Sequence, residues 1–304
     1  MTEIEKILNK GKIPEDFLNE EERCGFLVTV ERKKLWTVIL DLFFEFKRVC
    51  EKYDLRYFPC YGFLLGAVRH HGFIPWDDDL DVCMPRNDYE SFLKLAHEFH
   101  EPYFFQIPET DPGYFYGMAK IRNSNTTAIV RAFQYQGFNH GIWLSIFPMD
   151  NWKLDDGEMR FLKIKKHLTD CSTFMRKTNP FLSEKDKKRV DDLGDKDPWD
   201  SYRALNQIAS QYRNEKTEYQ LILCTVYPYL KNVYRSDDFS DVVTFDFENI
   251  EIPIPIGYDR VLKSVYGDYY KFPPIEERGD WHSGLLVDAD NSYVSYLRNL
   301  NHDD

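Results

Sequence analysis

The feature that most constrains this chain is a run of carboxylates directly after an apolar segment that contains glycine. Within Tyr61–Asp88, which reads YGFLLGAVRHHGFIPWDDDLDVCMPRND, aspartates occupy positions 77, 78, 79 and 81. Residues 79–83 predict a short strand, and side chains alternate between the two faces of a strand. Asp79 and Asp81 should therefore point the same way, and two adjacent carboxylates repel each other unless a cation lies between them.

Asp79 and Asp81 are for this reason candidate metal ligands. Hard oxygen ligands at this spacing suit Mg²⁺ or Mn²⁺, with substrate phosphates completing the coordination shell. An acidic surface turn without a metal is the alternative. The apolar residues Trp76, Leu80 and Val82 favour the metal site, because they place the pair beside a core.

The overall composition is that of a globular protein rather than a nucleic-acid binder. The chain has 304 residues, 43% of them hydrophobic and 16% aromatic, which is enough for one large core or two smaller ones. A formal net charge of −12 lacks the basic footprint that nucleic-acid binding requires. A nucleotide substrate is still possible, because a metal and a few local cations can hold its phosphates.

The first residues and the cysteines indicate the cellular compartment in which we expect the chain. The first residues show no signal-peptide pattern, and no window approaches the eighteen apolar residues of a transmembrane helix. The six cysteines form no Cys-x-x-Cys pair, so no structural zinc site is expected, and Cys50 and Cys83 lie in apolar segments as reduced core cysteines do. We expect a cytoplasmic location, with any membrane contact peripheral and at the inner face.

Hydrophobic periodicity predicts an α/β (α+β) fold with a mixed sheet and packed helices. Helices are expected at residues 32–53, 62–70 and 259–265, and a largely helical, charged region at 154–229. Strands are expected at 55–58, 103–107, 116–121, 126–130 and 141–147, with a hairpin or edge strand at 243–256. Proline should end the strands at Pro59, Pro85 and Pro148, and Asn87 should cap the helix that follows the acidic strand.

We divide the chain into four parts on this basis. Residues 1–31 form an N-terminal helical lead, 32–153 the core, 154–240 a helical region, and 241–304 a C-terminal hairpin, helix and tail that pack on the core.

The sequence around the aspartates resembles the LicD family of phosphotransferases, which includes phosphocholine transferases, and the related fukutin-type transferases. The first matching block is GFLLGAVRHHGFIPWDDDLDVCMPRNDYESF, and the second is FPMD at Phe147–Asp150. The third is YGDY at Tyr266–Tyr269, followed by two prolines, Arg278 and His282. The blocks occur in order and span residues 32–282.

The resemblance implies both a fold and a reaction. The fold would be a nucleotidyltransferase fold of the DNA polymerase beta type, with residues 32–153 as its catalytic core. The reaction would move a phospho-alcohol, such as phosphocholine, from a CDP-activated alcohol (CDP-choline or similar) to a sugar hydroxyl, with release of CMP. The acceptor would be a glycan or lipid-linked sugar, such as a capsule, teichoic acid or lipopolysaccharide precursor. Asp79 and Asp81 would hold Mg²⁺ or Mn²⁺ on the donor diphosphate, and a third carboxylate would come from a later strand.

The chain departs from the family pattern at two positions. Phe63 follows Gly62 where the family often has Thr or Ser, so one hydroxyl contact to phosphate is missing, although backbone N–H groups at the helix start can still serve. Ser145 stands where the family usually has the Asp that is our candidate third carboxylate.

The serine leaves three interpretations open. Asp150, Asp77 or Asp78 takes over as the third carboxylate, with Asp150 our named catalytic candidate. Alternatively, the chain is a weakened or non-catalytic nucleotide-binding member of the family. A different enzyme class, an Asp-x-Asp glycosyltransferase, also uses such a carboxylate pair to hold a nucleotide-sugar.

Further residues are expected to bind substrate. Gly62 and Gly66 can bring backbone close to a phosphate, with close helix packing as the alternative. Arg69 and His70 lie between the glycines and the aspartates, within reach of a diphosphate, and Arg suits phosphate oxygens through its planar fork. A solvated arginine and a hydrogen-bonded loop histidine are the alternatives.

The remaining candidates lie farther along the chain. Lys120 and Arg122 share one face of a predicted strand and would neutralise the leaving CMP phosphate, unless they are a surface-exposed pair. Trp76 would stack on the base or on choline, unless it is simply a core residue. Arg278 and His282 would act on the acceptor side or as a lid, or would only pack the tail.

Overall fold

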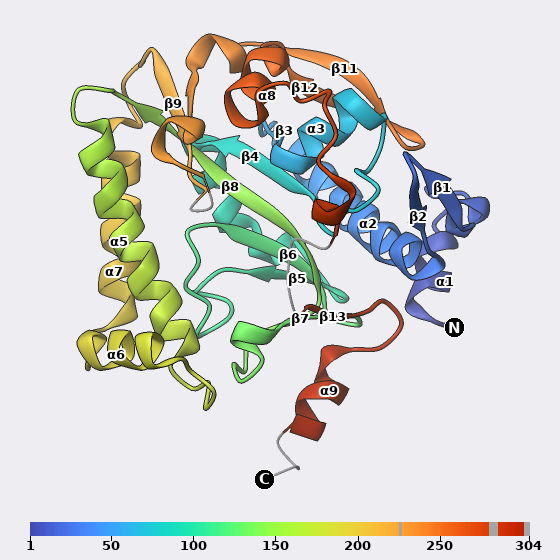
Figure 1. The fold of residues 1–304 in the computed structure, drawn as a ribbon, viewed down its shortest axis with the longest axis horizontal. Helices are drawn as coiled ribbons and strands as arrows, with labels where there is room; N and C mark the ends of the chain where they lie inside the picture. The colour runs from blue at the N-terminus through green and yellow to red at the C-terminus, as the bar shows by residue number, and fades with distance from the viewer. Residues whose placement is uncertain (225–226, 280–284, 301–304) are drawn as a thin grey trace.

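The computed structural model describes residues 1–224, 227–279 and 285–300, and within them a curled, mixed seven-stranded sheet forms the centre of an α/β fold (Figure 1). Its middle strand is β8 (Ile142–Trp152), which pairs in parallel with β4 (Asp81–Pro85). On its other side β8 pairs antiparallel first with β6 (Ala119–Asn123) and then with β9 (Tyr219–Ile222). The sheet is completed by β3 (Phe58–Cys60), β5 (Tyr103–Gln106) and β10 (Val233–Arg235).

Three helices position the acidic segment. Helix α2 (Val30–Lys52) packs against β6 and β8, and the side-chain oxygen of Thr29 caps it by accepting the Arg32 N–H. Helix α3 (Tyr61–His70) follows β3 directly, and α4 (Arg86–Phe92) follows β4 and packs on β8. The predicted helices at 32–53 and 62–70 are thus confirmed, because their apolar spacing does face the core.

The C-terminal part packs over α3. Strands β11 (Val242–Phe247) and β12 (Ile250–Pro255) form the predicted hairpin, and α8 (Tyr258–Tyr266) is the predicted helix. The carboxylate of Glu248, at the hairpin turn, accepts the Phe73 N–H and is held by Arg23. The hairpin therefore fixes the loop that leads from α3 to the aspartates.

Several predicted boundaries are wrong, and prolines explain most of them. Strand β4 begins at Asp81, so Asp79 precedes the strand instead of lying on it. Strand β3 includes Pro59, which is tolerated because β3 is an end strand of the sheet. Helix α4 begins at Arg86 directly after Pro85, so Asn87 lies in its first turn and is not its cap.

Strand β8 does not end at Pro148 but runs on to Trp152. The Ser145 N–H donates toward β4, to the Leu80 carbonyl, so by alternation the nitrogen of Pro148 faces the other edge. On that edge β6 pairs only as far as Ile146, and β9 begins at Met149. The proline thus falls in the gap between two partner strands, where no ladder hydrogen bond is lost.

A helical unit leaves the sheet after β8 and lies at the left of Figure 1. It consists of α5 (Gly157–Arg176), α6 (Glu184–Leu193) and α7 (Pro198–Ala209), and its apolar residues form a second core around Phe115, Phe161 and Leu205. The chain then returns to the sheet as β9, which the helical prediction for 154–229 missed. The four domain limits stay a prediction.

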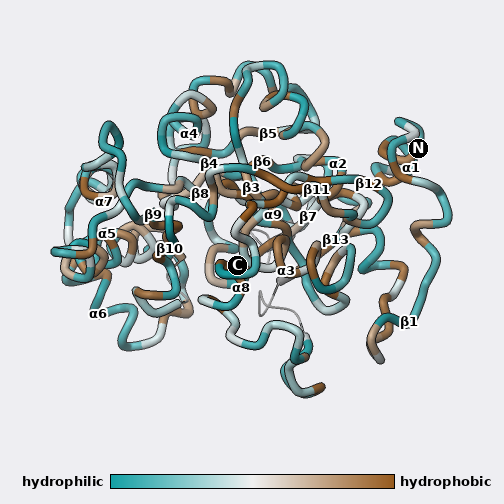
Figure 2. The backbone as a smooth tube through the Cα atoms, turned by 90° about the horizontal axis from the view of Figure 1, so that it is seen from above, coloured by the Kyte–Doolittle hydropathy of each residue, from teal (hydrophilic) through white to brown (hydrophobic). Residues whose placement is uncertain are grey.

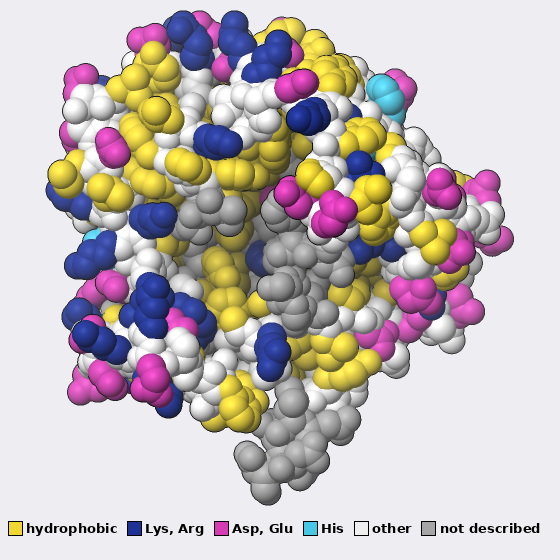
Figure 3. Space-filling view, viewed as in Figure 1, with side chains coloured by type: hydrophobic (Ala, Val, Ile, Leu, Met, Phe, Trp, Pro, Cys, Tyr) yellow, Lys and Arg dark blue, Asp and Glu magenta, His cyan; other side chains and the backbone are white. Residues whose placement is uncertain are grey.

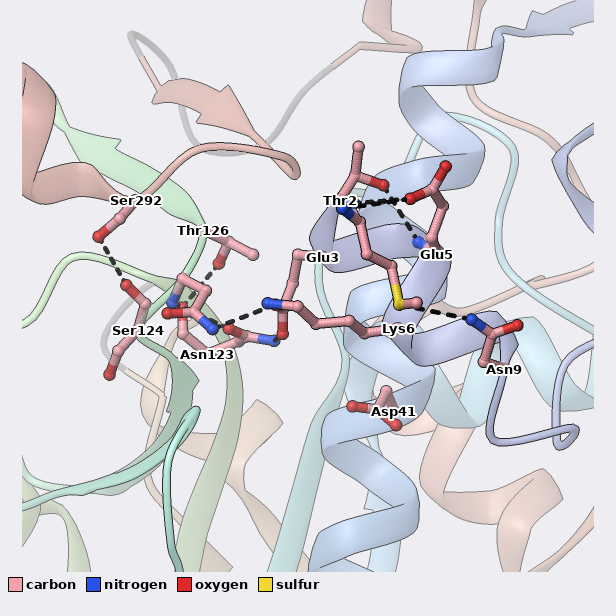
Figure 4. Close-up of polar contacts among 12 residues, drawn as sticks. Thr2, Glu3, Glu5, Lys6, Asn9, Asp41, Asn123, Ser124, Thr126 and Ser292 are labelled. Carbon is pink, nitrogen blue, oxygen red and sulfur yellow. Dashed lines mark hydrogen bonds and ion pairs between the residues drawn. The ribbon is translucent and has the colours of Figure 1, made fainter.

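The N-terminal segment is attached to the turn after β6. It contains α1 (Glu3–Leu8), β1 (Glu21–Arg23) and β2 (Phe26–Val28). Figure 4 shows Asn123 beside Glu3, and the Glu3 carboxylate accepts hydrogen bonds from the side chains of Asn123 (3.0 Å) and Asn125 (3.1 Å). Burial raises the pKa of Glu3, but these hydrogen bonds and Lys6 outweigh it, so the pKa is lowered overall.

The other described elements complete the fold. Strand β7 (Thr127–Val130) pairs with β13 (Leu285–Asp288), and α9 (Tyr293–Leu300) follows. Short 3₁₀ helices span Glu15–Leu18, Leu93–Glu98, Arg131–Phe133, Ser210–Tyr212, Tyr229–Asn232, Ser236–Phe239 and Ile275–Glu277.

Hydrophobic segments concentrate along the central strands in Figure 2, and the outer loops are hydrophilic. No helix in the described part of the chain is both long enough and apolar enough to cross a membrane. Cys50 and Cys83 are free thiols and are buried as predicted.

Candidate active site

The aspartates gather at the start of β4 and form what we call the acidic cluster: Asp77, Asp78, Asp79 and Asp81. One carboxylate oxygen from each of the first three lies within 4.8 Å of the others. Asp77 is buried, and burial together with the charges of Asp79, Asp78 and Asp81 raises its pKa well above its ordinary range. Crowded carboxylates are a donor set that fits a divalent cation, since bound positive charge relieves their repulsion.

The backbone of the cluster is held rigidly by α2 and α3. The indole N–H of Trp36 (3.1 Å) and the guanidinium of Arg32 (2.9 Å) both donate to the carbonyl oxygen of Asp77. Gly62, in the first turn of α3, lies against the Asp77 side chain so closely that a Cβ there would overlap a carboxylate oxygen. Gly62 therefore makes room for a carboxylate of the cluster.

A cleft of about 520 Å³ lies between the sheet and the helical unit. It is lined by Asp79 and Asp81, which we call its acidic end, by Lys120, Arg122 and Ser145 of the sheet, and by several aromatic rings. Figure 3 shows this face of the molecule hollowed between the helical unit and the rest, with Lys and Arg side chains on the helical side. The cleft thus combines an acidic end, cations and aromatic faces in one space.

The strand register places three of the predicted residues in one row. Asp81 of β4 is paired with Ser145 of β8, and Ser145 is paired with Lys120 of β6. Directly paired residues point to the same face of a sheet, and all three line the cleft. Ser145 therefore lies beside a cluster aspartate, which is where a third carboxylate would be needed.

Lys120 and Arg122 share one strand face as predicted, but they are buried (7% and 4% exposed), which rules out a surface-exposed pair. The ammonium of Lys120 lies 3.8 Å from the ring centroid of Trp143. Burial, then Arg122, lowers the pKa of Lys120, while Asp79 and Asp81 act in the opposite direction. Arg122 donates to the side chain of Gln106, and burial lowers its pKa to about 10.

Asp150 lies at the other end of β8. Its buried carboxylate is held by Arg86 through two hydrogen bonds, Nε–Oδ1 at 2.6 Å and Nη2–Oδ2 at 2.7 Å. It is five positions from Ser145 along the strand, or about 16 Å at the usual rise per residue. The structure does not bring Asp150 to the acidic cluster, which corrects the expectation that it could replace the third carboxylate.

Arg69, His70 and Trp76 form a second group with the tail, outside the cleft. Arg69 donates to the ring nitrogen Nε2 of His70 and to the Tyr269 carbonyl, both at 2.8 Å. Burial and then Arg69 lower the pKa of His70 to about 4, so the imidazole is neutral at neutral pH. Trp76 is buried (2% exposed), and the Arg278 guanidinium lies 4.9 Å from its ring centroid.

These contacts favour packing over substrate binding for this second group. Gly66 likewise has a packing reason, since a Cβ there would overlap the carbonyl oxygen of Gly72. The group still borders the acidic cluster, because Trp76 directly precedes Asp77. His282 lies outside the described residues, and substrate contacts by the other members stay predictions.

The sequence-based interpretation missed several cleft residues. It named Asp77 only as a substitute, because strand alternation singled out Asp79 and Asp81. It also overlooked the cations of the helical unit that line the cleft, Lys165, Arg176 and Arg189. Lys165 and Arg176 are eleven residues apart on α5, about three helical turns, so helical spacing was the signal that could have found them.

Comparison with known proteins identifies the family that the central part of this site resembles. Residues 54–167 match the family described as LicD/FKTN/FKRP, nucleotidyltransferase domain, and this range contains the acidic cluster, Lys120 and Ser145. The chain carries a LicD family domain. The resemblance identified in the sequence is thereby confirmed.

Relatives of this LicD-domain chain include one with a named activity. The lipopolysaccharide cholinephosphotransferase LicD of Haemophilus influenzae is 29% identical over 267 residues, which cover 81% of this chain and 93% of the relative. An uncharacterized protein of Rickettsia typhi is 42% identical over 50 residues, 16% of each chain. A second, from Rickettsia prowazekii, is 40% identical over 50 residues, covering 16% of this chain and 19% of the relative.

Proposed function

We propose that this chain is a metal-dependent transferase that moves a phospho-alcohol, phosphocholine or a close analogue, from a CDP-activated donor to a sugar hydroxyl of a surface-glycan precursor. The observation that carries the proposal is the acidic cluster at the end of a cleft that also holds buried cations. The LicD family domain and the name of the Haemophilus relative support the choice of phosphocholine and of a lipopolysaccharide acceptor. A nucleotidyltransferase-type fold is part of the proposal.

Asp77, Asp79 and Asp81 would hold Mg²⁺ or Mn²⁺. Such an ion supplies Lewis-acid charge to the donor phosphate oxygens when it is bound. The chain's own part is to position the ligands through Trp36, Arg32 and Gly62, so that little reorganisation is needed when the donor arrives.

The cations and rings of the cleft would hold the donor. Lys120 and Arg122 contribute positive charge beside the acidic end, where the leaving CMP gains negative charge. The rings of Trp143 and Tyr116, which line the cleft, offer aromatic faces for the cytosine base or the quaternary ammonium of choline.

The reaction then needs only positioning and charge, as other phosphoryl transfers do. A bond forms between the acceptor hydroxyl oxygen and the phosphorus that carries the alcohol. The bond from that phosphorus to the bridging diphosphate oxygen breaks, and this oxygen leaves with CMP. The hydroxyl proton passes to water.

The experiment is a transfer assay of the purified chain with CDP-choline, CDP-glycerol and CDP-ribitol, each with a lipopolysaccharide acceptor and Mg²⁺ or Mn²⁺. We expect transfer from one of these donors and none after Asp79→Ala. A preference for UDP- or GDP-sugars over every CDP-alcohol would reject the proposal in favour of a glycosyltransferase. A cytoplasmic location at the inner face of the membrane stays a prediction.

One observation favours a second candidate, a family member with weakened catalysis. Ser145, the neutral residue paired with Asp81, offers no carboxylate where a third one would lie. A large gain in turnover for Ser145→Asp, with little change in nucleotide affinity, would identify this chain as a weakened enzyme.

A further inference from the structure

Lys120 is a buried cation that faces the cleft without an ion pair to any described residue. Its side chain is 7% exposed, and no carboxylate in the described ranges 1–224, 227–279 and 285–300 lies within 4.0 Å of its ammonium. The Trp143 ring beside it carries no charge that would neutralise it. A buried charge that lacks a charged partner is costly, which points to a ligand that supplies the opposite charge.

The row across the sheet explains why this lysine lacks a carboxylate partner among the described residues. Ser145 lies between Asp81 on one side and Lys120 on the other. A carboxylate at position 145 would serve both neighbours: it would add an oxygen ligand beside Asp81, and it would neutralise Lys120. The serine does neither, so the row has no carboxylate at position 145 to add to Asp81 or to neutralise the Lys120 ammonium.

We propose that Lys120 takes the place of a second metal ion. The chain binds one divalent cation at the acidic cluster, and the Lys120 ammonium supplies the second positive charge directly to a phosphate oxygen of the donor. The inference rests on the proposed function, because it requires a nucleoside diphosphate in the cleft.

The neighbours of Lys120 fit this assignment. Arg122 donates hydrogen bonds to the Gln106 side chain and to the Gly141 carbonyl oxygen, and its charge lowers the pKa of Lys120. Arg122 would therefore act on the donor through its charge, and the direct contact would fall to Lys120. Asp79 and Asp81 attract the ammonium toward the acidic end. An ammonium suits this position because it acts on phosphate as a compact point charge.

The test counts metal ions and measures nucleotide affinity on the full-length chain, so it does not depend on turnover. Electron paramagnetic resonance of free Mn²⁺ gives the number of ions bound in the presence of CDP, and calorimetry gives the affinities for CDP and for cytidine. The variants are Lys120→Met, Lys120→Arg and the double variant Lys120→Met with Ser145→Asp. Lys94→Met is the matched control, because Lys94 is exposed on the 3₁₀ helix at 93–98 and does not line the cleft.

We expect one Mn²⁺ per wild-type chain. Lys120→Met should weaken CDP binding at least tenfold and leave cytidine binding within twofold, while Lys120→Arg retains most of the CDP affinity. Lys120→Met should not lower the melting temperature, since it removes a buried charge that has no ion pair. The double variant should bind a second Mn²⁺ with CDP, because the carboxylate introduced by Ser145→Asp then has no lysine to pair with.

Two ions per wild-type chain would overturn the inference, even if Lys120→Met failed to fold. An equal CDP affinity in Lys120→Met and Lys94→Met would overturn it as well, while leaving the proposed function intact. A wild-type chain that binds neither Mn²⁺ nor CDP would instead reject the proposed function.

Discussion

The two ends of the β4–β8 pair hold buried carboxylates in opposite surroundings. At one end the Asp150 carboxylate accepts hydrogen bonds from two nitrogens of Arg86, so its charge is neutralised within the fold. At the other end Asp77 is buried among Asp78, Asp79 and Asp81. Burial is the main cause that raises its pKa, and the charges of these three aspartates raise it further. The difference separates a carboxylate that the fold neutralises from carboxylates that we propose bind a ligand.

Glu3 belongs with Asp150 in this comparison. Both are buried carboxylates with partners in place, and for Glu3 the amides of Asn123 and Asn125 lower the pKa despite burial. Burial alone therefore does not mark a functional carboxylate. We propose that burial beside like charges, as at Asp77, is the better marker.

The largest expected effect is on activity at the acidic end. Asp79→Asn should reduce phosphocholine transfer about a thousandfold or more, because the bound cation is worth several kcal/mol of transition-state stabilisation. The melting temperature should stay equal or rise, since one of several crowded charges is removed. Transfer assays and thermal melting of the same preparation measure the activity and the melting temperature of Asp79→Asn. Activity within threefold of wild type would contradict the assignment of a catalytic role to the acidic cluster.

At the opposite end the effect should fall on stability. Asp150→Asn leaves Arg86 buried and unmatched, and the free energy of unfolding should drop by about 3–5 kcal/mol. Transfer per folded molecule should stay within threefold. Urea unfolding measures the loss, and the double variant Arg86→Met with Asp150→Leu should recover much of it, because both charges are then gone.

A smaller effect is expected at Gly62. In Gly62→Ala the new methyl group overlaps the Asp77 carboxylate, which should weaken Mn²⁺ binding about tenfold and cost about 1–3 kcal/mol of stability through overpacking. Gly137→Ala is the control, since a Cβ at Gly137 meets only open space. Similar Mn²⁺ affinities in the two variants would show that Gly62 does not position the cluster.

The smallest effect concerns Glu3 and pH. Because the pKa of Glu3 is lowered in the folded chain, its stabilisation is present above the unfolded-state pKa and is lost as the pH falls through the folded-state pKa. Glu3→Gln should therefore reduce stability by about 1 kcal/mol at pH 7 and by almost nothing below about pH 3. Urea unfolding of both chains across this pH range measures the difference in their free energies of unfolding. A difference that persists in acid would mean that Glu3 contributes through its shape and not through its charge.

Much of the acidic end could be predicted from the sequence, because its residues are neighbours in the chain. Four aspartates in five positions, preceded by a glycine-containing helix, indicate a metal site whether or not Asp79 lies on the strand. The pairing of Ser145 with Asp81 agrees with the expected place of the third carboxylate, since both residues begin paired strand segments.

The rest depends on contacts between distant residues. Nothing near Asp150 in the sequence indicates that Arg86, 64 positions earlier, neutralises it. The register between β6 and β8, which sets Lys120 beside Ser145, follows from tertiary pairing and not from local pattern. Pro148 misled the prediction because a proline costs nothing in the gap between two partner strands.

The most direct test of the account is a calorimetric titration of MnCl₂ into the wild-type chain, Asp79→Asn and Asp150→Asn, at a temperature where all three are folded. The account predicts saturable binding of about one ion to the wild-type chain and to Asp150→Asn, and a loss of binding in Asp79→Asn. Binding that is absent from the wild-type chain, or that survives Asp79→Asn and disappears in Asp150→Asn, would contradict it.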